Sequence, residues 1–402
     1  MNLKGFLVLK SCCIELYVKR ERMKEIVILN PNRVVFGEGS MQRFVDDFVE
    51  KGFKRLFLLS ITELSHTLVP FLNTLTSQGV EIVIDESIVG EPTFDDFNKT
   101  LEKAIAFNAD SVVGIGGGSV LDVAKLVAAQ LKNTQTLDEI KGIGNLKERQ
   151  IYVACIPTTS GTGSEVSPNA IFVNELGEKV GIISPFLVPD AAYIDPVLTV
   201  SLPKSITAAT GIDALTHCLE AYTNKFAHPF VDLYALEGVR LIAKYLKRAC
   251  DNGSDLEARA QVALGSMYGG MCLGPVNTAT VHALSYPLGV EYHIPHGLSN
   301  ALLLPYVMEY NIEADASKYE RIAEVLGAEK KATSKETALE GVKIMKQLIA
   351  DCGLPLTLSE AGVKKESIPQ LAEGAIKVQR LLKNNIREIA VEDAVAIYQS
   401  AF

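Results

Sequence analysis

The feature that most constrains the fold is a change of pattern near Pro203. Before it, short apolar runs of strand length alternate with helical stretches, which is typical of βαβ units and a mostly parallel sheet. After it, apolar residues recur at intervals of three and four, which predicts helices, and strand patterns are almost absent. The sequence therefore predicts an α/β half followed by an all-helical half.

The expected elements follow this division. In the first half we expect strands over 25–29, 33–36, 55–60, 80–84, 111–115 and 151–155, and helices over about 40–51, 65–77, 94–107 and 120–131. In the second half we expect helices over about 205–223, 230–250, 255–273, 276–286, 298–311, 316–327, 335–351, 367–382 and 391–401. A chain of 402 residues exceeds the size that one hydrophobic core usually supports, so two domains are expected. We place them at 24–203 and 204–402, with residues 1–23 as an N-terminal extension and Met23 as an alternative start.

Composition excludes several classes of protein. Lys and Arg number 39 against 48 Asp and Glu, a net charge of −9, and no basic stripe is present, so no nucleic-acid partner is expected. No apolar run reaches the ~18 residues of a membrane-spanning helix, so no membrane association is expected. The seven Cys are scattered without a C-x-x-C pair, which suits a reducing compartment and predicts a cytoplasmic protein.

Two turns offer small donors for a phosphate. Gly116, Gly117, Gly118 and Ser119 lie between an expected strand and an expected helix, where glycines let the backbone approach a phosphate. The second turn, 156–165, follows another apolar strand and holds several hydroxyls, among them Thr158, Thr159 and Thr162. A tight βα turn and a polar loop with an N-cap at Ser164 are the plainer interpretations. Together, however, the turns indicate a cleft for a nucleotide diphosphate at the carboxyl ends of the strands.

Four residues of the second half form a plausible metal-binding set. Asp213 and His217 are four apart, so a helix would place them on one face. His282 and His296 follow, and one carboxylate with three imidazoles suits a divalent first-row metal. Spacing alone leaves open that these are three hydrogen-bonded His on separate helices.

These motifs occur in the order found in one known family. They are Gly116-Gly117-Gly118-Ser119-x-x-Asp122-x-x-Lys125, Pro157-Thr158-Thr159-Ser160-Gly161-Thr162-Gly163-Ser164-Glu165, Pro189-Asp190 with Asp195-Pro196, Asp213-x-x-x-His217, and His282 with Pro295-His296-Gly297. Over roughly residues 25–402, the chain resembles the iron-containing (group III) alcohol dehydrogenases.

The resemblance implies a fold and a chemistry. It implies an N-terminal Rossmann-like dinucleotide-binding domain and a C-terminal helical metal-binding domain, the architecture shared with dehydroquinate synthase. It implies that Fe²⁺, or Zn²⁺ as the alternative, is held by Asp213, His217, His282 and His296. It also implies NAD or NADP as cofactor, bound by Gly116, Gly117, Gly118, Ser119, Asp122, Thr158, Thr159, Thr162 and Lys179. The expected reaction is hydride transfer between a short-chain alcohol, diol or hydroxy acid and NAD(P)⁺, or the reverse reduction, in a homodimer.

Three departures from the family pattern affect details. Tyr286 stands where many members carry a second His, a plausible proton relay, and His293 is the more titratable neighbour. Ile61 stands where an acidic residue often binds the adenosine ribose, and Glu63 is the candidate substitute, so NAD and NADP both stay open. Ile386 replaces a Pro common between Asn and Arg, which we expect to affect only local helix geometry.

Other members of the superfamily provide the alternatives. A glycerol dehydrogenase usually has Lys where Ser119 stands, and a dehydroquinate synthase-like lyase has Glu as its carboxylate ligand, so Asp213 favours the alcohol dehydrogenases. A metal- and nucleotide-binding protein without turnover is the remaining alternative. Candidate residues for the substrate pocket are Asn169, Phe172, Met271 and Pro275.

Overall fold

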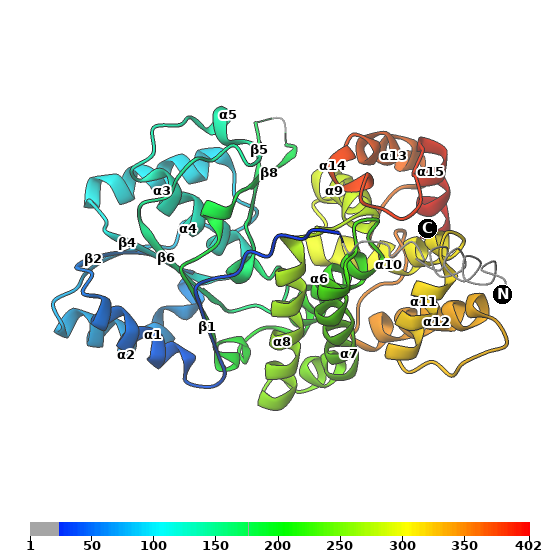
Figure 1. Ribbon diagram of the computed structural model, residues 1–402, viewed down its shortest axis with the longest axis horizontal. Coiled ribbons are helices and arrows are strands. Elements are labelled where there is room, and N and C mark those ends of the chain that lie inside the picture. Colours follow the sequence, from blue (N-terminus) through cyan, green and yellow to red (C-terminus); the bar gives the residue numbers. More distant parts are fainter. Residues whose placement is uncertain (1–23, 176) are drawn as a thin grey trace, which may run out of the picture.

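The computed structural model describes residues 24–175 and 177–402, so the predicted extension over 1–23 lies outside the described residues. Its α/β half and its helical half lie side by side (Figure 1). The last described strand ends at Ile194, and the elements described beyond it are helices. The predicted fold class, a parallel sheet with helices followed by a helical part, is confirmed.

Six parallel strands form the main sheet, in the order β1-β9-β6-β4-β2-β3. They are β1 (Arg33–Phe36), β2 (Arg55–Leu59), β3 (Glu81–Asp85), β4 (Ser111–Gly116), β6 (Tyr152–Pro157) and β9 (Ala191–Ile194). Successive side chains of β2 point to opposite faces, so Leu56 and Leu58 pack in one core while Phe57 and Leu59 pack in the other. The first core is closed by α1 (Ser40–Lys51) and α2 (Ser65–Ser77), the second by α3 (Phe94–Phe107) and α4 (Gly118–Gln130).

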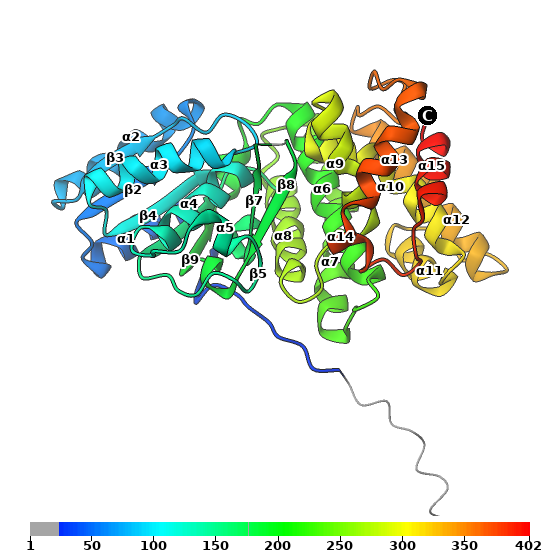
Figure 2. The ribbon, with the colours of Figure 1, turned by 90° about the horizontal axis from the view of Figure 1, so that it is seen from above.

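A second, smaller sheet was not predicted. It has the order β5-β8-β7, with β5 (Gly142–Ile143), β7 (Asn169–Val173) and β8 (Lys179–Ile183). β7 and β8 run antiparallel, and the sheet lies between the main sheet and the helical half (Figure 2). The strand predicted over 25–29 is wrong, because these residues are not part of any sheet.

Helices from α6 onward build the second half around one large core. They are α6 (Lys204–Thr223), α7 (Pro229–Asp251), α8 (Leu256–Leu273), α9 (Thr280–Tyr292), α10 (His296–Ile312), α11 (Ala316–Val325), α12 (Ser334–Asp351), α13 (Ile368–Ile376), α14 (Gln379–Leu382) and α15 (Val391–Ser400). Two predictions needed correction: the helix expected from residue 276 begins at Thr280, and the one expected over 367–382 is broken between α13 and α14. Among the described residues, no helix is both long and apolar enough to cross a bilayer.

Candidate metal and cofactor site

Helix α6 places three polar side chains on one buried face. Asp213, His217 and Glu220 are spaced by four and three residues, so they lie on the same side of the helix. Their exposed fractions are 3%, 5% and 3%. Burying two carboxylates is costly unless each is paired or hydrogen-bonded, so this face requires partners from other helices.

Helices α9 and α10 supply those partners. From Asp213 Oδ1 the Nε2 atoms lie at 3.8 Å in His217, 3.5 Å in His282 and 3.7 Å in His296. The rings of His217 and His282 stack at 4.8 Å between centroids. The donor atoms of Asp213, His217 and His282 all lie within 4.8 Å of one another, and His296 stands at the more open edge, with 26% of its side chain exposed. The predicted ligands therefore converge.

The polar balance of this cluster fits a metal ion. Asn300 Nδ2 donates to Asp213 Oδ1 over 2.7 Å and lies 3.2 Å from His282 Nε2 and 3.4 Å from His296 Nε2. One amide group, with two protons, thus faces a carboxylate oxygen and two ring nitrogens whose donor or acceptor role depends on the tautomer. The buried Nδ1 atoms of His217 and His296 also have no hydrogen-bond partner. Asp213 Oδ1 and the three Nε2 atoms face one small volume that a divalent cation suits.

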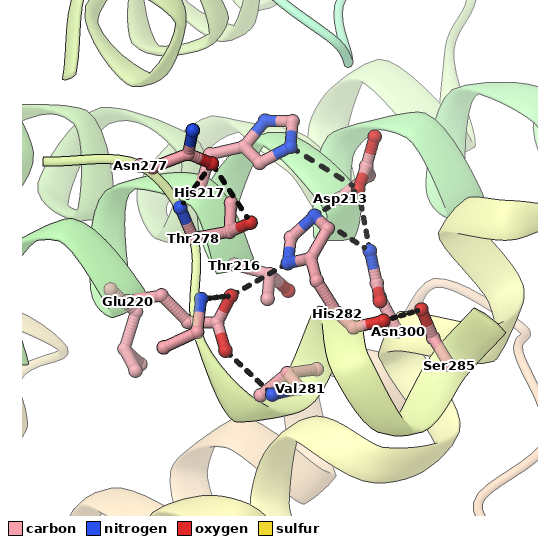
Figure 3. A network of polar contacts seen from close by, with 12 residues as sticks. Asp213, Thr216, His217, Glu220, Asn277, Thr278, Val281, His282, Ser285 and Asn300 are labelled. Carbon is pink, nitrogen blue, oxygen red and sulfur yellow. Dashed lines mark hydrogen bonds and ion pairs between the residues drawn. The ribbon is translucent and has the colours of Figure 1, made fainter. Parts of the chain in front are cut away.

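Glu220 fixes the orientation of His282 (Figure 3). Its Oε2 accepts from His282 Nδ1 at 2.6 Å and from the Ala279 amide at 3.0 Å, and its Oε1 accepts from the Val281 amide at 2.6 Å. The ring then presents Nε2 to Asp213, which is the carboxylate–histidine arrangement usual at metal sites. Glu220 and Asn300 are not among the residues predicted from the sequence. Their signal was available, since Glu220 follows His217 by three residues and Asn300 follows His296 by four.

Burial and neighbouring charges set the protonation of the cluster. Burial opposes a charged carboxylate, yet the surrounding imidazoles hold the pKa of Asp213 well below its usual range. Burial lowers the pKa of His217 and, together with the Lys179 ammonium, lowers that of His296 well below its usual value. Burial would also lower the pKa of His282, but Glu220 and Asp213 raise it to about 10. The lowered pKa values of His217 and His296 favour the neutral imidazole, which is the form that binds a metal ion.

The two turns of the α/β half meet opposite this cluster. Gly118 begins α4, and a Cβ there would come within 2.5 Å of Thr162 Cγ2, so the turns touch at this glycine. Asp122 joins them as well, since it accepts hydrogen bonds from Ser164 Oγ and from the Ile171 amide. The sequence therefore brings two separate polar turns to one place.

One cavity of about 490 Å³ connects the turns with the four predicted ligands. Of the predicted cofactor contacts, Gly118, Ser119, Asp122, Thr162 and Lys179 line it. Gly116, Gly117, Thr158 and Thr159 do not, and Thr158 is buried with its amide bonded to the Gly116 carbonyl at 2.9 Å. Of the four candidates for the substrate pocket, Asn169 and Phe172 line the cavity, whereas Met271 and Pro275 do not.

Tyr286 and His293 also line the cavity. The centroid of the Tyr286 ring lies 6.0 Å from that of the His296 ring. Lys179 Nζ lies over the Tyr286 ring, 5.1 Å from its centroid. His293 ends α9 in the left-handed region, with φ 54°. Both are thus near the cluster without being part of it.

Comparison with known proteins places the chain in a family. Residues 31–196 match the family described as iron-containing alcohol dehydrogenase, and residues 207–402 match the C-terminal part of the Fe-containing alcohol dehydrogenase family. The long-chain-alcohol dehydrogenase 1 of Geobacillus thermodenitrificans is 36% identical over 388 residues, covering 92% of this chain and 96% of that protein. The chain therefore belongs to the iron-containing alcohol dehydrogenase family, and it is an oxidoreductase of that type.

Solved structures agree with this assignment. A 1,3-propanediol oxidoreductase has a TM-score of 0.90 at 32% identity, covering 94% of this chain and 100% of that one. A sulfoacetaldehyde reductase from Bifidobacterium kashiwanohense, solved in complex with NAD⁺, has a TM-score of 0.84 at 25% identity, covering 94% and 99%. The glycerol dehydrogenase-like, lyase-like and non-catalytic alternatives are not favoured by these matches.

Proposed function

We propose that the protein transfers a hydride between a small alcohol and NAD(P)⁺, or in reverse to an aldehyde or ketone, with a divalent metal at Asp213, His217, His282 and His296. The observation that carries the proposal is the single cavity, about 490 Å³, that holds both the polar turn residues and the ligand cluster. A cofactor bound at one wall and a substrate at the other would place donor and acceptor carbons in one enclosed space.

The chain's own residues have separable tasks in this reaction. Gly118, Ser119 and Thr162 would bind the cofactor diphosphate, because small side chains and a helix start give it N–H and O–H donors. Ile171, Phe172 and Leu273 line the same cavity with apolar surface and would exclude water during transfer. Glu220 would keep His282 in the ligand orientation. A metal ion bound by the cluster would supply Lewis-acid polarisation of the substrate oxygen.

The identities of the metal and of the cofactor are two further choices. We propose iron from the family, with zinc as the alternative, because three imidazoles and a carboxylate accept either ion. We propose NAD⁺ or NADP⁺ as the cofactor. The position where the family often has an acidic residue for the ribose holds Ile61, which is partly buried, and the nearby carboxylate, Glu63, lies exposed beyond β2. Comparing kcat/KM for NADH and NADPH, with metal analysis of the same anaerobic sample, would decide both choices.

Assembly and location are further proposals. β1 is an edge strand of the main sheet, and its Val34 is 41% exposed. An unpaired edge with apolar side chains is suited to pairing with a second copy, so we propose a homodimer joined near the N-terminal strands. Light scattering of the purified chain tests this. We also propose that the protein is cytoplasmic, which fractionation of the native cells would test.

Replacing His282 tests the function directly. His282→Ala should abolish both tight metal binding and turnover of short aldehydes with NAD(P)H, because it removes one ligand from a buried site. The matched control is His66→Ala, since His66 is exposed on α2, outside the cluster. Turnover in a metal-free His282→Ala protein would overturn the proposal.

A further inference from the structure

Two cations line the cavity beside the smaller sheet, and they come from opposite halves of the molecule. Lys179 is the first residue of β8, and Arg380 lies in α14. Arg380 reaches across to the sheet, because a Cβ built on Gly181 of β8 would lie 3.6 Å from Arg380 Nη2. Both side chains line the cavity that contains the ligand cluster.

The positive charge of Lys179 is already paired with a carboxylate. Its Nζ lies 2.5 Å from Glu91 Oε1 and 5.1 Å over the ring of Tyr286, and only 6% of its side chain is exposed. The other acids of the cavity are compensated too, since Asp122 pairs with Lys125 at 3.2 Å and Asp213 belongs to the histidine cluster. Among the described residues that line the cavity, no acidic side chain is left to pair with a second cation.

Arg380 is the cation without a counter-charge. Among the described residues, 24–175 and 177–402, it has no carboxylate within ion-pair distance and no hydrogen-bond acceptor. Arg380 is partly buried at the cavity wall, where water screens charge less than in bulk solvent. A planar group with five N–H donors in this setting matches the two oxygens of a carboxylate or sulfonate.

The surroundings suit a short chain that ends in such an anion. The apolar residues lining the cavity are Pro92, Ile171, Phe172, Val173, Leu273, Ile294 and Pro295. The cofactor diphosphate would lie at the β4–α4 turn, whereas Arg380 lies against β8 of the other sheet. An anion held by Arg380 would thus be part of the substrate, with its reacting carbon directed to the ligand cluster.

We propose that the physiological substrate is an alcohol or aldehyde carrying a carboxylate or sulfonate at the end remote from the reacting carbon, and that Arg380 is the residue that selects it. The inference rests on the proposed hydride-transfer function and specifies its substrate class. It assigns Arg380 to substrate recognition only, with no part in the hydride step.

The test compares two aldehydes of equal length, butanal and 4-oxobutanoate, in the metal-loaded enzyme with NAD(P)H. We expect the wild-type kcat/KM to favour the anionic aldehyde by roughly 10-fold or more, the size of effect expected for a charge-assisted pair. Arg380→Gln should remove this preference by raising KM for 4-oxobutanoate while leaving butanal unchanged. Arg380→Lys should restore part of the preference for the anionic aldehyde.

The control is Lys377→Gln, which makes the same charge change on an exposed side chain near the end of α13. It should preserve the preference.

A second readout needs no turnover. Calorimetric titration with propane-1-sulfonate should show binding to the wild type and to Lys377→Gln, and at least a 10-fold weaker affinity in Arg380→Gln. Equal activity on both aldehydes in the wild type would overturn the inference while leaving the proposed function intact. A loss of NAD(P)H affinity in Arg380→Gln would overturn it as well, because Arg380 would then serve the cofactor. Failure to turn over either aldehyde would instead contradict the proposed function.

Discussion

The buried carboxylate of Glu220 accepts three hydrogen bonds, although Glu220 is not one of the proposed metal ligands. Two of them come from the backbone before and within the first turn of α9, so one carboxylate fixes both the helix start and the ring of His282. At the scale of residues, the site depends on such supporting groups as much as on the ligands, because a ring free to rotate would bind a metal weakly.

Glu220→Gln should therefore weaken metal binding without removing a ligand. The amide keeps the size of the side chain but loses the charge that supports His282, and we expect the metal dissociation constant to rise about 10- to 100-fold. Competition with a chromophoric chelator measures this directly. Glu237→Gln, an exposed change on α7, is the control. Unchanged metal affinity in Glu220→Gln would show that the hydrogen bonds to Ala279 and Val281 are purely structural.

Tyr286 offers a contrasting prediction. Its ring contacts Lys179 and lies near His296, but its hydroxyl makes no hydrogen bond with the described residues. Tyr286→Phe should keep kcat/KM within about twofold and leave the pH profile unchanged, because the ring alone makes the contacts. Loss of one limb of the pH–rate profile would instead identify the phenol as a proton relay.

At the scale of elements, local signals predicted much of this structure. The bounds of α2 and α3 agree with the predicted 65–77 and 94–107, and for α3 the reason is a capping box formed by Thr93 and Asp96. The smaller sheet escaped prediction because β5 has two residues, and β7 and β8 pair across a short turn. Asp213 and His217 were found from helical spacing. Arg380 was not, since its position depends on a contact with residue 181, which no local pattern reports.

The capping box leads to a pH-dependent prediction. Hydrogen bonds from Thr93 hold the pKa of Asp96 below its usual value. A lowered pKa in the folded state means that the ionised carboxylate stabilises the fold above the unfolded pKa of about 3.9, and that this stabilisation is lost as pH falls through the folded value. Asp96→Asn should thus lower Tm at pH 7, by an amount corresponding to about 1 kcal/mol, and the difference from wild type should shrink under acid conditions. Thermal melts at pH 7 and in steps below pH 4 measure it. A difference independent of pH would contradict the role of the charge.

At the scale of the whole molecule, the two halves meet through glycines. A Cβ on Gly163, which has φ +60°, would lie 2.3 Å from Gly270 Cα in α8. A Cβ on Gly161 would lie 2.8 Å from Thr210 Cβ in α6. The hydroxyl-rich turn therefore rests directly on the helices of the second half, and this close approach sets the distance between the cofactor turns and the ligand cluster.

Gly270→Ala tests this junction, because helix propensity predicts a gain in stability whereas the close contact predicts a loss. Ala is better than Gly inside a helix by about 1 kcal/mol, so the substitution in α8 should stabilise the protein if space allowed. The added Cβ would instead meet the Gly163 carbonyl oxygen at 2.4 Å and its Cα at 2.7 Å, and backbone atoms cannot move aside without shifting the turn. We expect a Tm lower by several degrees, with weaker NAD(P)H binding because the turn is displaced.

The matched control is Gly289→Ala in α9, where the nearest atom would lie at 3.7 Å and the Tm should hold or rise. A rise in Tm for Gly270→Ala would mean that the halves can separate at this contact without cost, so that the glycines do not set the width of the cavity.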